Sequence, residues 1–313
     1  MVGSMFDVFE GPSTSSTQAQ DIHCDYVLVD GSKRENTERW LYELVEAPDY
    51  GNLFDGTEWA SIRDVAPLLV RTEPGHPLLE RLLQEGKITE WGYGIASNEP
   101  LELVADHLRR FITACHPLGH NVMLRFSDPT VARLLLAPSG HGGVPEYWEP
   151  FTGVALPDAL WDGWHVQARP EWLPEAGAGT NKEITAPFQL GELTLSGLTA
   201  TDLRTTLVKL MQHLETYFPE RAASEIRPVA IKDLRTIMEQ ALANGYESLQ
   251  ALLHWCTVYG YQGELSRWET ETPDIHALFY RWPGAAAEAQ AREAAMIAMA
   301  SAATQVQGEP IHG

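Results

Sequence analysis

The stretch Tyr26-Val27-Leu28-Val29-Asp30-Gly31 is a short apolar run that ends at two turn-forming residues. A run of this kind, bounded by Asp and Gly, is typical of a buried β-strand followed by a turn. Similar runs return at Leu68–Arg71, Trp91–Ala96 and Asn121–Phe126. Segments between and after them carry apolar residues three or four positions apart, as amphipathic helices do. This alternation predicts an α/β fold with a largely parallel sheet covered by helices, because parallel neighbours need crossover connections.

Two aromatic-rich runs, Trp148–Leu156 and Gly163–Ala168, are candidates for antiparallel edge strands of this sheet. The second half of the chain shows helical periodicity instead, with leucine-rich stripes over 203–218, 234–242 and 249–256. Three such stripes are most simply packed as an α-helical lobe.

Polar and Gly-rich segments divide the chain. Residues 12–18 are Pro, Ser, Thr and Gln without apolar periodicity, and the chain between Pro170 and Pro187 is rich in Glu, Gly, Ala and Pro. The predicted organisation is a flexible leader (1–22), an α/β domain (23–170), a linker (171–187), an α-helical C-terminal lobe (188–283) and an Ala-rich tail (284–313).

The chain is strongly acidic. Its 313 residues include 22 Lys and Arg against 43 Asp and Glu, a net charge of −21. Nucleic-acid binding and attraction to anionic membranes both need clustered basic residues, so neither partner is expected. The three cysteines form no CxxC pair, and no stretch has the pattern of a signal peptide or a membrane span. We expect an acidic cytoplasmic protein.

Catalytic and metal-binding patterns are weak throughout the chain. His116 and His120 have the spacing of zinc ligands on a helix, but Pro117 and Gly119 lie between them and no Glu follows the first His. Ser139 and His141 lie in a Gly-rich segment without the G-x-S-x-G order of a nucleophile elbow. No catalytic residue, metal or cofactor is predicted. A hydrolase based on Ser139 and His141, or a metal-dependent enzyme based on the two other histidines, stays as an alternative.

A series of short motifs resembles the N-terminal domain of type VI secretion effector adaptors, the Tap or effector-chaperone family. In order along the chain they are Val27-Leu28-Val29-Asp30-Gly31, Asn52-Leu53-Phe54-Asp55-Gly56-Thr57, Trp91-Gly92, His107-Leu108-Arg109-Arg110-Phe111 and Leu124-Arg125-Phe126-Ser127-Asp128-Pro129. The resemblance covers about residues 24–136. Ser127 stands where the family usually has an aromatic residue.

The resemblance implies a non-enzymatic adaptor that binds a cognate toxic effector in the cytoplasm and loads it onto the VgrG spike protein. Partner-binding candidates are Asp55, Trp59, Trp91, Arg109, Arg125 and Asp128. Asp128 has a second interpretation as a helix N-cap, and Arg125 as a structural charge. A cytoplasmic immunity protein, which neutralises its toxin directly, is a further alternative.

Overall fold

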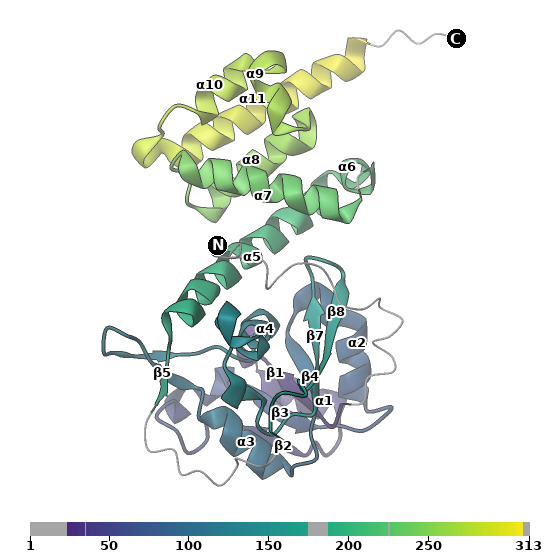
Figure 1. Ribbon diagram of the computed structural model, residues 1–313. Coiled ribbons are helices and arrows are strands. Elements are labelled where there is room, and N and C mark those ends of the chain that lie inside the picture. The colour runs from purple at the N-terminus through teal and green to yellow at the C-terminus, as the bar shows by residue number, and fades with distance from the viewer. Residues whose placement is uncertain (1–23, 35, 175–186, 225, 309–313) are drawn as a thin grey trace. The chain divides into compact units, whose positions relative to one another are not determined.

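The computed structural model describes residues 24–34, 36–174, 187–224 and 226–308 (Figure 1). The chain divides by internal contacts into a first unit, 1–202, and a second unit, 203–313. The predicted leader and most of the predicted linker, residues 175–186, lie outside the described residues.

The main sheet of the first unit, sheet A, has six strands in the order β2-β3-β1-β4-β7-β8. Each neighbouring pair in it is antiparallel, so the prediction of a largely parallel sheet is wrong. Gly163–Ala168 is confirmed as an antiparallel edge strand. The first aromatic-rich run is antiparallel only from Gly153 onward, and its strand lies inside the sheet between β4 and β8, so the prediction of an edge strand there is wrong. The strands are β1 (Tyr26–Val29), β2 (Tyr50–Asn52), β3 (Leu68–Arg71), β4 (Gly92–Ala96), β7 (Gly153–Asp158) and β8 (Gly163–Ala168).

The strand order explains why the alternation of strands and helices led to the wrong prediction of a parallel sheet. β3 and β4 flank β1 and are each antiparallel to it, so they run parallel to one another. The helix α2 (Pro77–Thr89) connects them, and the sequence shows this crossover correctly. It gives no sign that β1 lies between the two strands. The four residues of β1 are also buried on both faces, and such a strand has the continuous apolar composition usual in parallel sheets.

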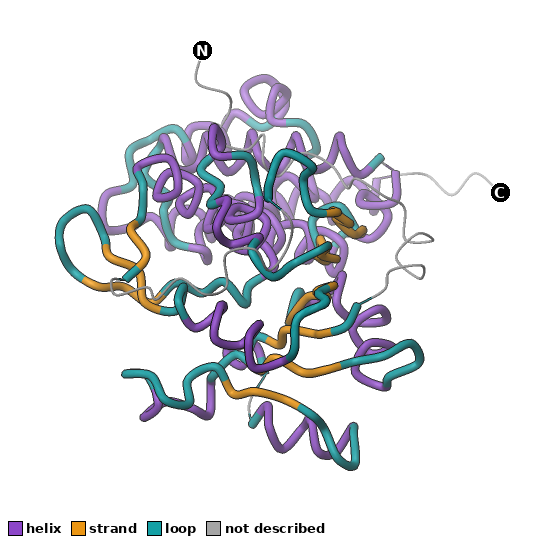
Figure 2. The backbone as a smooth tube through the Cα atoms, turned by 60° about the horizontal axis from the view of Figure 1, so that its bottom comes forward, coloured by secondary structure: helices purple, strands orange, loops and turns teal. Residues whose placement is uncertain are grey.

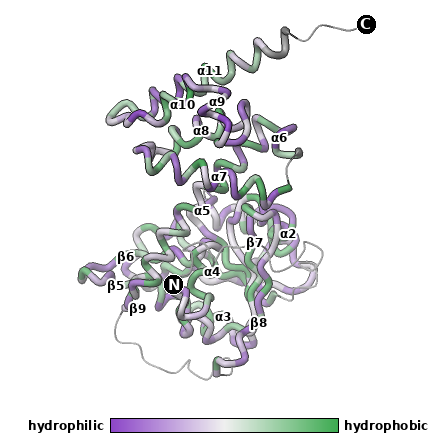
Figure 3. The backbone as a smooth tube through the Cα atoms, turned by 45° about the horizontal axis from the view of Figure 1, so that its top comes forward, coloured by the Kyte–Doolittle hydropathy of each residue, from purple (hydrophilic) through white to green (hydrophobic). Residues whose placement is uncertain are grey.

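Helices cover both faces of sheet A (Figures 1 and 3). Successive residues of β1 point to opposite faces: Leu28 lies in one core cluster, Val27 and Val29 in the other. Leu41 of α1 (Thr37–Leu44) and Leu82 of α2 belong to the Val27 cluster. α3 (Leu101–Arg109) and α4 (Pro129–Leu136) pack into the Leu28 cluster on the opposite face.

A smaller sheet and several 3-10 turns complete the first unit. The small sheet has the order β6-β5-β9, in which β5 and β9 are parallel. Its strands are β5 (Thr113–Cys115), β6 (Asn121–Met123) and β9 (Phe188–Gln189). The 3-10 turns are η3 (Gly31–Lys33), η4 (Ala60–Val65), η5 (Ser139–His141) and η6 (Pro145–Trp148).

The described part of the second unit consists of helices and loops, without a strand, as the green-to-yellow part of Figure 1 shows. Figure 2 colours the helices, strands and loops of the whole chain. Its core is aromatic: Trp255 lies 4.0 Å from Phe279 between ring centroids, and Tyr246 and Trp268 surround this pair. The helices are α5 (Glu192–Tyr217, which begins in the first unit), α6 (Pro219–Ser224), α7 (Arg227–Ala243), α8 (Leu249–Gln262), α9 (Trp268–Glu271), α10 (Pro273–Phe279) and α11 (Ala287–Gly308), with the 3-10 turns η7 (Leu265–Arg267) and η8 (Gly284–Ala286).

Candidate partner-binding site

The motifs of the first unit converge at one end of sheet A. Val29, the last residue of β1, pairs with Leu68 and with Gly92, and Asn52 also pairs with Leu68. The ends of β1 and β2 and the starts of β3 and β4 therefore lie together. We call this region the Asp30 end, because Asp30 directly follows β1.

Asp30 is a buried carboxylate that holds Arg125. It is 1% exposed, and its Oδ2 accepts hydrogen bonds from Nε and Nη2 of Arg125 at 3.0 and 2.7 Å. Its Oδ1 accepts from the backbone N–H of Ser32 at 3.0 Å and so caps η3. Burial opposes the charge of Arg125, but the charge and hydrogen bonds of Asp30, together with the charge of Asp128, outweigh burial and raise the pKa of Arg125.

Asp128 continues this network to α4. Its Oδ1 accepts from the backbone N–H of Thr130 at 2.9 Å, which confirms the predicted N-cap. Its Oδ2 lies 3.6 Å from Arg125 Nη2 and 3.6 Å from Lys33 Nζ. Arg125 thus bridges two carboxylates, yet its side chain remains 46% exposed and reachable from solvent.

Asn52 connects Asp55 and Arg109. The Asn52 carbonyl accepts from Asp55 N–H at 3.3 Å and from Arg109 Nη2 at 3.1 Å. Its side-chain oxygen accepts from Phe54 N–H at 3.0 Å, and its amide donates to Glu38 at 2.9 Å. Asn52 is 4% exposed, so it acts as a buried anchor for the loop that carries Asp55.

A charged and aromatic surface surrounds that loop. Arg63 Nη2 lies 2.9 Å from Glu38 and 3.7 Å from Asp55, and the hydrogen bond that Arg63 donates to the Glu38 carboxylate raises the pKa of Arg63. Trp59 is half-buried, and its Nε1 donates to Thr113 at 2.9 Å.

Trp91 has a different environment from the other candidates. It is 1% exposed and meets Trp40 edge to face at a centroid distance of 5.4 Å. The guanidinium of Arg34 lies over the Trp40 ring at 4.2 Å. In the described part of the chain the Trp91 Nε1 has no hydrogen-bond partner, whereas its carbonyl accepts from Asp30 N–H at 2.8 Å. This side chain packs beneath the Asp30 end and does not face solvent.

Asp30 therefore contacts Arg125 and the Trp91 backbone, and Asn52 contacts Asp55 and Arg109. Asp128 joins the first group through Arg125, whereas Trp59 is held separately through Thr113. The sequence did not show that Asp30 and Asn52 each bond several other motif residues, although both lie inside motifs that we quoted. Sequence reasoning also missed Glu38 and Arg63, which are 25 positions apart and have no sequence signal beyond opposite charge.

The residues of the alternative enzyme hypotheses lie elsewhere. His116 and His120 stack at 4.7 Å across the turn between β5 and β6, and His116 Nδ1 accepts from Leu118 N–H at 3.1 Å. Ser139 and His141 lie exposed in η5. Among the residues with described positions, no group of three or more His, Cys, Asp or Glu side chains is arranged to hold a metal ion.

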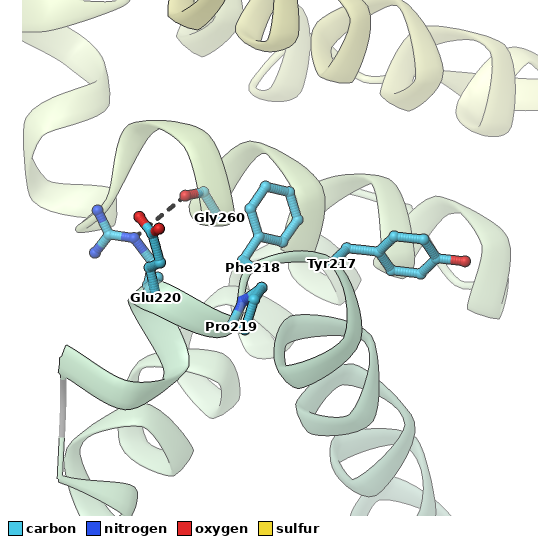
Figure 4. Close-up of a pocket in the computed structure, with 6 residues that line it drawn as sticks. Tyr217, Phe218, Pro219, Glu220 and Gly260 are labelled. Carbon is cyan, nitrogen blue, oxygen red and sulfur yellow. Dashed lines mark hydrogen bonds between the residues drawn. The ribbon is translucent and has the colours of Figure 1, made fainter.

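The second unit contains an open cavity of about 530 Å³ at the corner between α5 and α6. The ring of Phe218 lies over Gly260 of α8, whereas Tyr217 points away from it (Figure 4). Arg221 Nε donates to the Gly260 carbonyl at 3.2 Å, and Glu220 lies beside it. One carboxylate and one guanidinium line this cavity, so its charge does not select between anionic and cationic ligands.

Comparison with known proteins identifies the region that contains this site. Residues 26–141 match the family model described as "Domain of unknown function (DUF4123)". These residues are a DUF4123 domain, the domain of type VI secretion effector adaptors. The match includes the Asp30 end with Asp30 and Asn52, and the resemblance noted in the sequence is confirmed.

A relative extends the similarity beyond the DUF4123 domain. The chain is 25% identical over 274 residues to "Accessory protein VasW" from Vibrio cholerae serotype O1 (strain ATCC 39315 / El Tor Inaba N16961), covering 85% of this chain and 86% of that protein. No solved structure matches the chain. Within the described ranges, no helix is long and apolar enough to cross a membrane. Together these similarities support an accessory or adaptor role in type VI secretion.

Proposed function

We propose that this protein binds a cognate toxic effector and delivers it to the VgrG spike protein of the type VI secretion apparatus. The observation that carries the proposal is the match of residues 26–141 to the DUF4123 family. These residues include all the hydrogen-bonded motifs at the Asp30 end. In this proposal the protein acts in the cytoplasm by binding and needs no cofactor.

The exposure of the candidate residues supports two different roles, contact with a partner for some and structural support for others. Asp55 and Arg125 are exposed, and Trp59 and Arg109 are half-buried, so these four are placed to contact a partner. Asp128 and Trp91 are buried and hold the surface in shape. The helical second unit would supply further contacts that differ between effectors, because the DUF4123 match ends at residue 141.

Co-expression with the products of neighbouring genes tests this proposal. The tagged chain is captured, and mass spectrometry identifies each protein retained. The expected result is a stable complex with a toxin or with VgrG. Recovery of the chain alone, under conditions in which a related adaptor retains its own effector, would overturn the proposal.

A further inference from the structure

The 3-10 turn η4 is an exposed apolar surface at the Asp30 end. All six of its residues, Ala60–Val65, are exposed. Ile62 is 42% and Val65 46% exposed. Ile62 has non-helical backbone angles (φ −118°, ψ 34°), so η4 consists of two short turns joined at a kink, and each turn exposes one large apolar side chain. Two exposed apolar side chains form only a small contact area, so the charges beside them must contribute to the selection of a partner.

Hydrogen bonds hold this turn in place although none of its side chains is buried. Arg63 C=O accepts from Asn52 Nδ2 at 3.3 Å, and the Arg63 guanidinium binds Glu38 of α1 at 2.9 Å. Trp59, the residue before the turn, is fixed through Thr113. A partner that binds here meets a preformed surface and pays little to order it, which favours affinity.

The charge around η4 specifies the kind of partner. Four carboxylates belong to the turn or to residues beside it, and two of them, those of Glu38 and Asp55, pair with Arg63 of the turn itself. Asp64 makes no hydrogen bond or ion pair with another described residue, so its charge is available to a ligand. The whole chain carries −21, which attracts basic partners at longer range. The four carboxylates belong to Glu38, Asp55, Glu58 and Asp64.

We propose that η4 docks a basic segment of the secreted cargo, with an apolar side chain of that segment packed on Ile62 and Val65 and lysine or arginine beside the carboxylates. This inference rests on the proposed function and assigns one of its contact surfaces. An acidic or uncharged apolar segment would lack charge complementarity with this rim.

The variant that tests the surface is Ile62→Ser combined with Asp64→Asn in the full chain. Both side chains are exposed, so the fold should be retained, and a circular dichroism melt verifies this. The matched control is Ile88→Ser combined with Glu80→Gln, which removes an exposed isoleucine and an exposed carboxylate from α2.

The probes are three short fluorescein-labelled peptides, composed of lysine and leucine, of lysine and serine, or of glutamate and leucine. We expect the lysine–leucine peptide to bind the wild type most tightly, with affinity reduced about tenfold in the η4 variant and less than about twofold in the control. Equal losses in the two variants, or equal binding of the glutamate–leucine peptide, would overturn the inference.

Cargo retention separates this inference from the proposed function. In the co-expression assay, the η4 variant should retain clearly less of the cargo that the wild type retains, and the control variant should retain as much. If the wild type retains cargo and the η4 variant retains it equally, the docking surface is wrong and the adaptor function stands. If the wild type retains none, the adaptor function itself fails.

Discussion

Arg125 donates two hydrogen bonds to Asp30, a residue 95 positions earlier that is 1% exposed. This pair joins the end of the central strand to the segment that enters α4. Charged hydrogen bonds from a forked guanidinium fix both distance and orientation. The motifs around the two residues therefore describe one structural unit of the DUF4123 domain.

Arg125→Ala should lower the free energy of unfolding by about 2 kcal/mol, because it leaves the buried Asp30 carboxylate without its cationic partner. The value lies below that of a fully buried pair, since the Arg125 side chain is half-exposed. Urea denaturation measures the change. Arg39→Ala, which breaks only an exposed pair with Glu43, should change stability by less than about 0.5 kcal/mol. Similar losses in both variants would contradict the structural role of the Arg125–Asp30 pair.

Ser127→Ala should leave stability unchanged or increase it by about 1 kcal/mol. Ser127 is 1% exposed, and in the described structure its hydroxyl has no hydrogen-bond partner. Removing an unsatisfied buried hydroxyl avoids a desolvation cost without loss of a bond. The same urea experiment checks this. A loss above about 1 kcal/mol would mean that the hydroxyl makes a bond in solution.

Because of His107, we expect the free energy of unfolding to fall in mild acid. Its ring is buried against Tyr147 and Phe111, and burial lowers its pKa below the ordinary value of 6.5 despite the nearby Glu149. The unfolded chain therefore binds the proton first, and stability falls as the pH drops below about 6.5 towards the pKa of the folded state.

The contribution of His107 to this acid sensitivity is measured by comparing how the urea midpoint changes with pH in the wild type and in His107→Gln. Glutamine retains a donor for the Tyr147 carbonyl, which His107 Nε2 contacts at 3.2 Å, but it does not titrate. Between about pH 7.5 and about pH 5.5, the urea midpoint of this variant should fall less than that of the wild type. His120→Gln, at an exposed turn, serves as the control and should fall as the wild type does.

Gly260→Ala should destabilise the second unit by about 1–3 kcal/mol. A Cβ at this position would lie 2.5 Å from the Phe218 ring, which packs directly on the helix. Alanine normally stabilises a helix relative to glycine, so a loss here isolates the steric effect. Gly140→Ala, in a 3-10 turn of the first unit where a Cβ meets nothing within 4 Å, serves as a control for a glycine-to-alanine change without steric conflict. A Gly260→Ala protein as stable as the wild type would contradict the packing of Phe218.

Sequence reasoning predicted local structure better than strand direction. The apolar run at β1 and the Asp128 cap were correctly predicted because their signals lie within a few residues. Strand order depends on pairing between distant segments, and a strand buried on both faces has the same composition in either orientation. The sequence also indicated the motifs of the adaptor domain but not how they meet, because Asp30 and Asn52 act through long-range hydrogen bonds.

The secretion of the cargo tests the central claim most directly. The gene for this protein is deleted in its host, and the cognate toxin is measured in cells and in culture medium. We predict that the toxin remains in cells but disappears from the medium, and that the wild-type gene restores it. Undiminished release of the toxin from the deletion strain, with release still dependent on the type VI apparatus, would contradict the account.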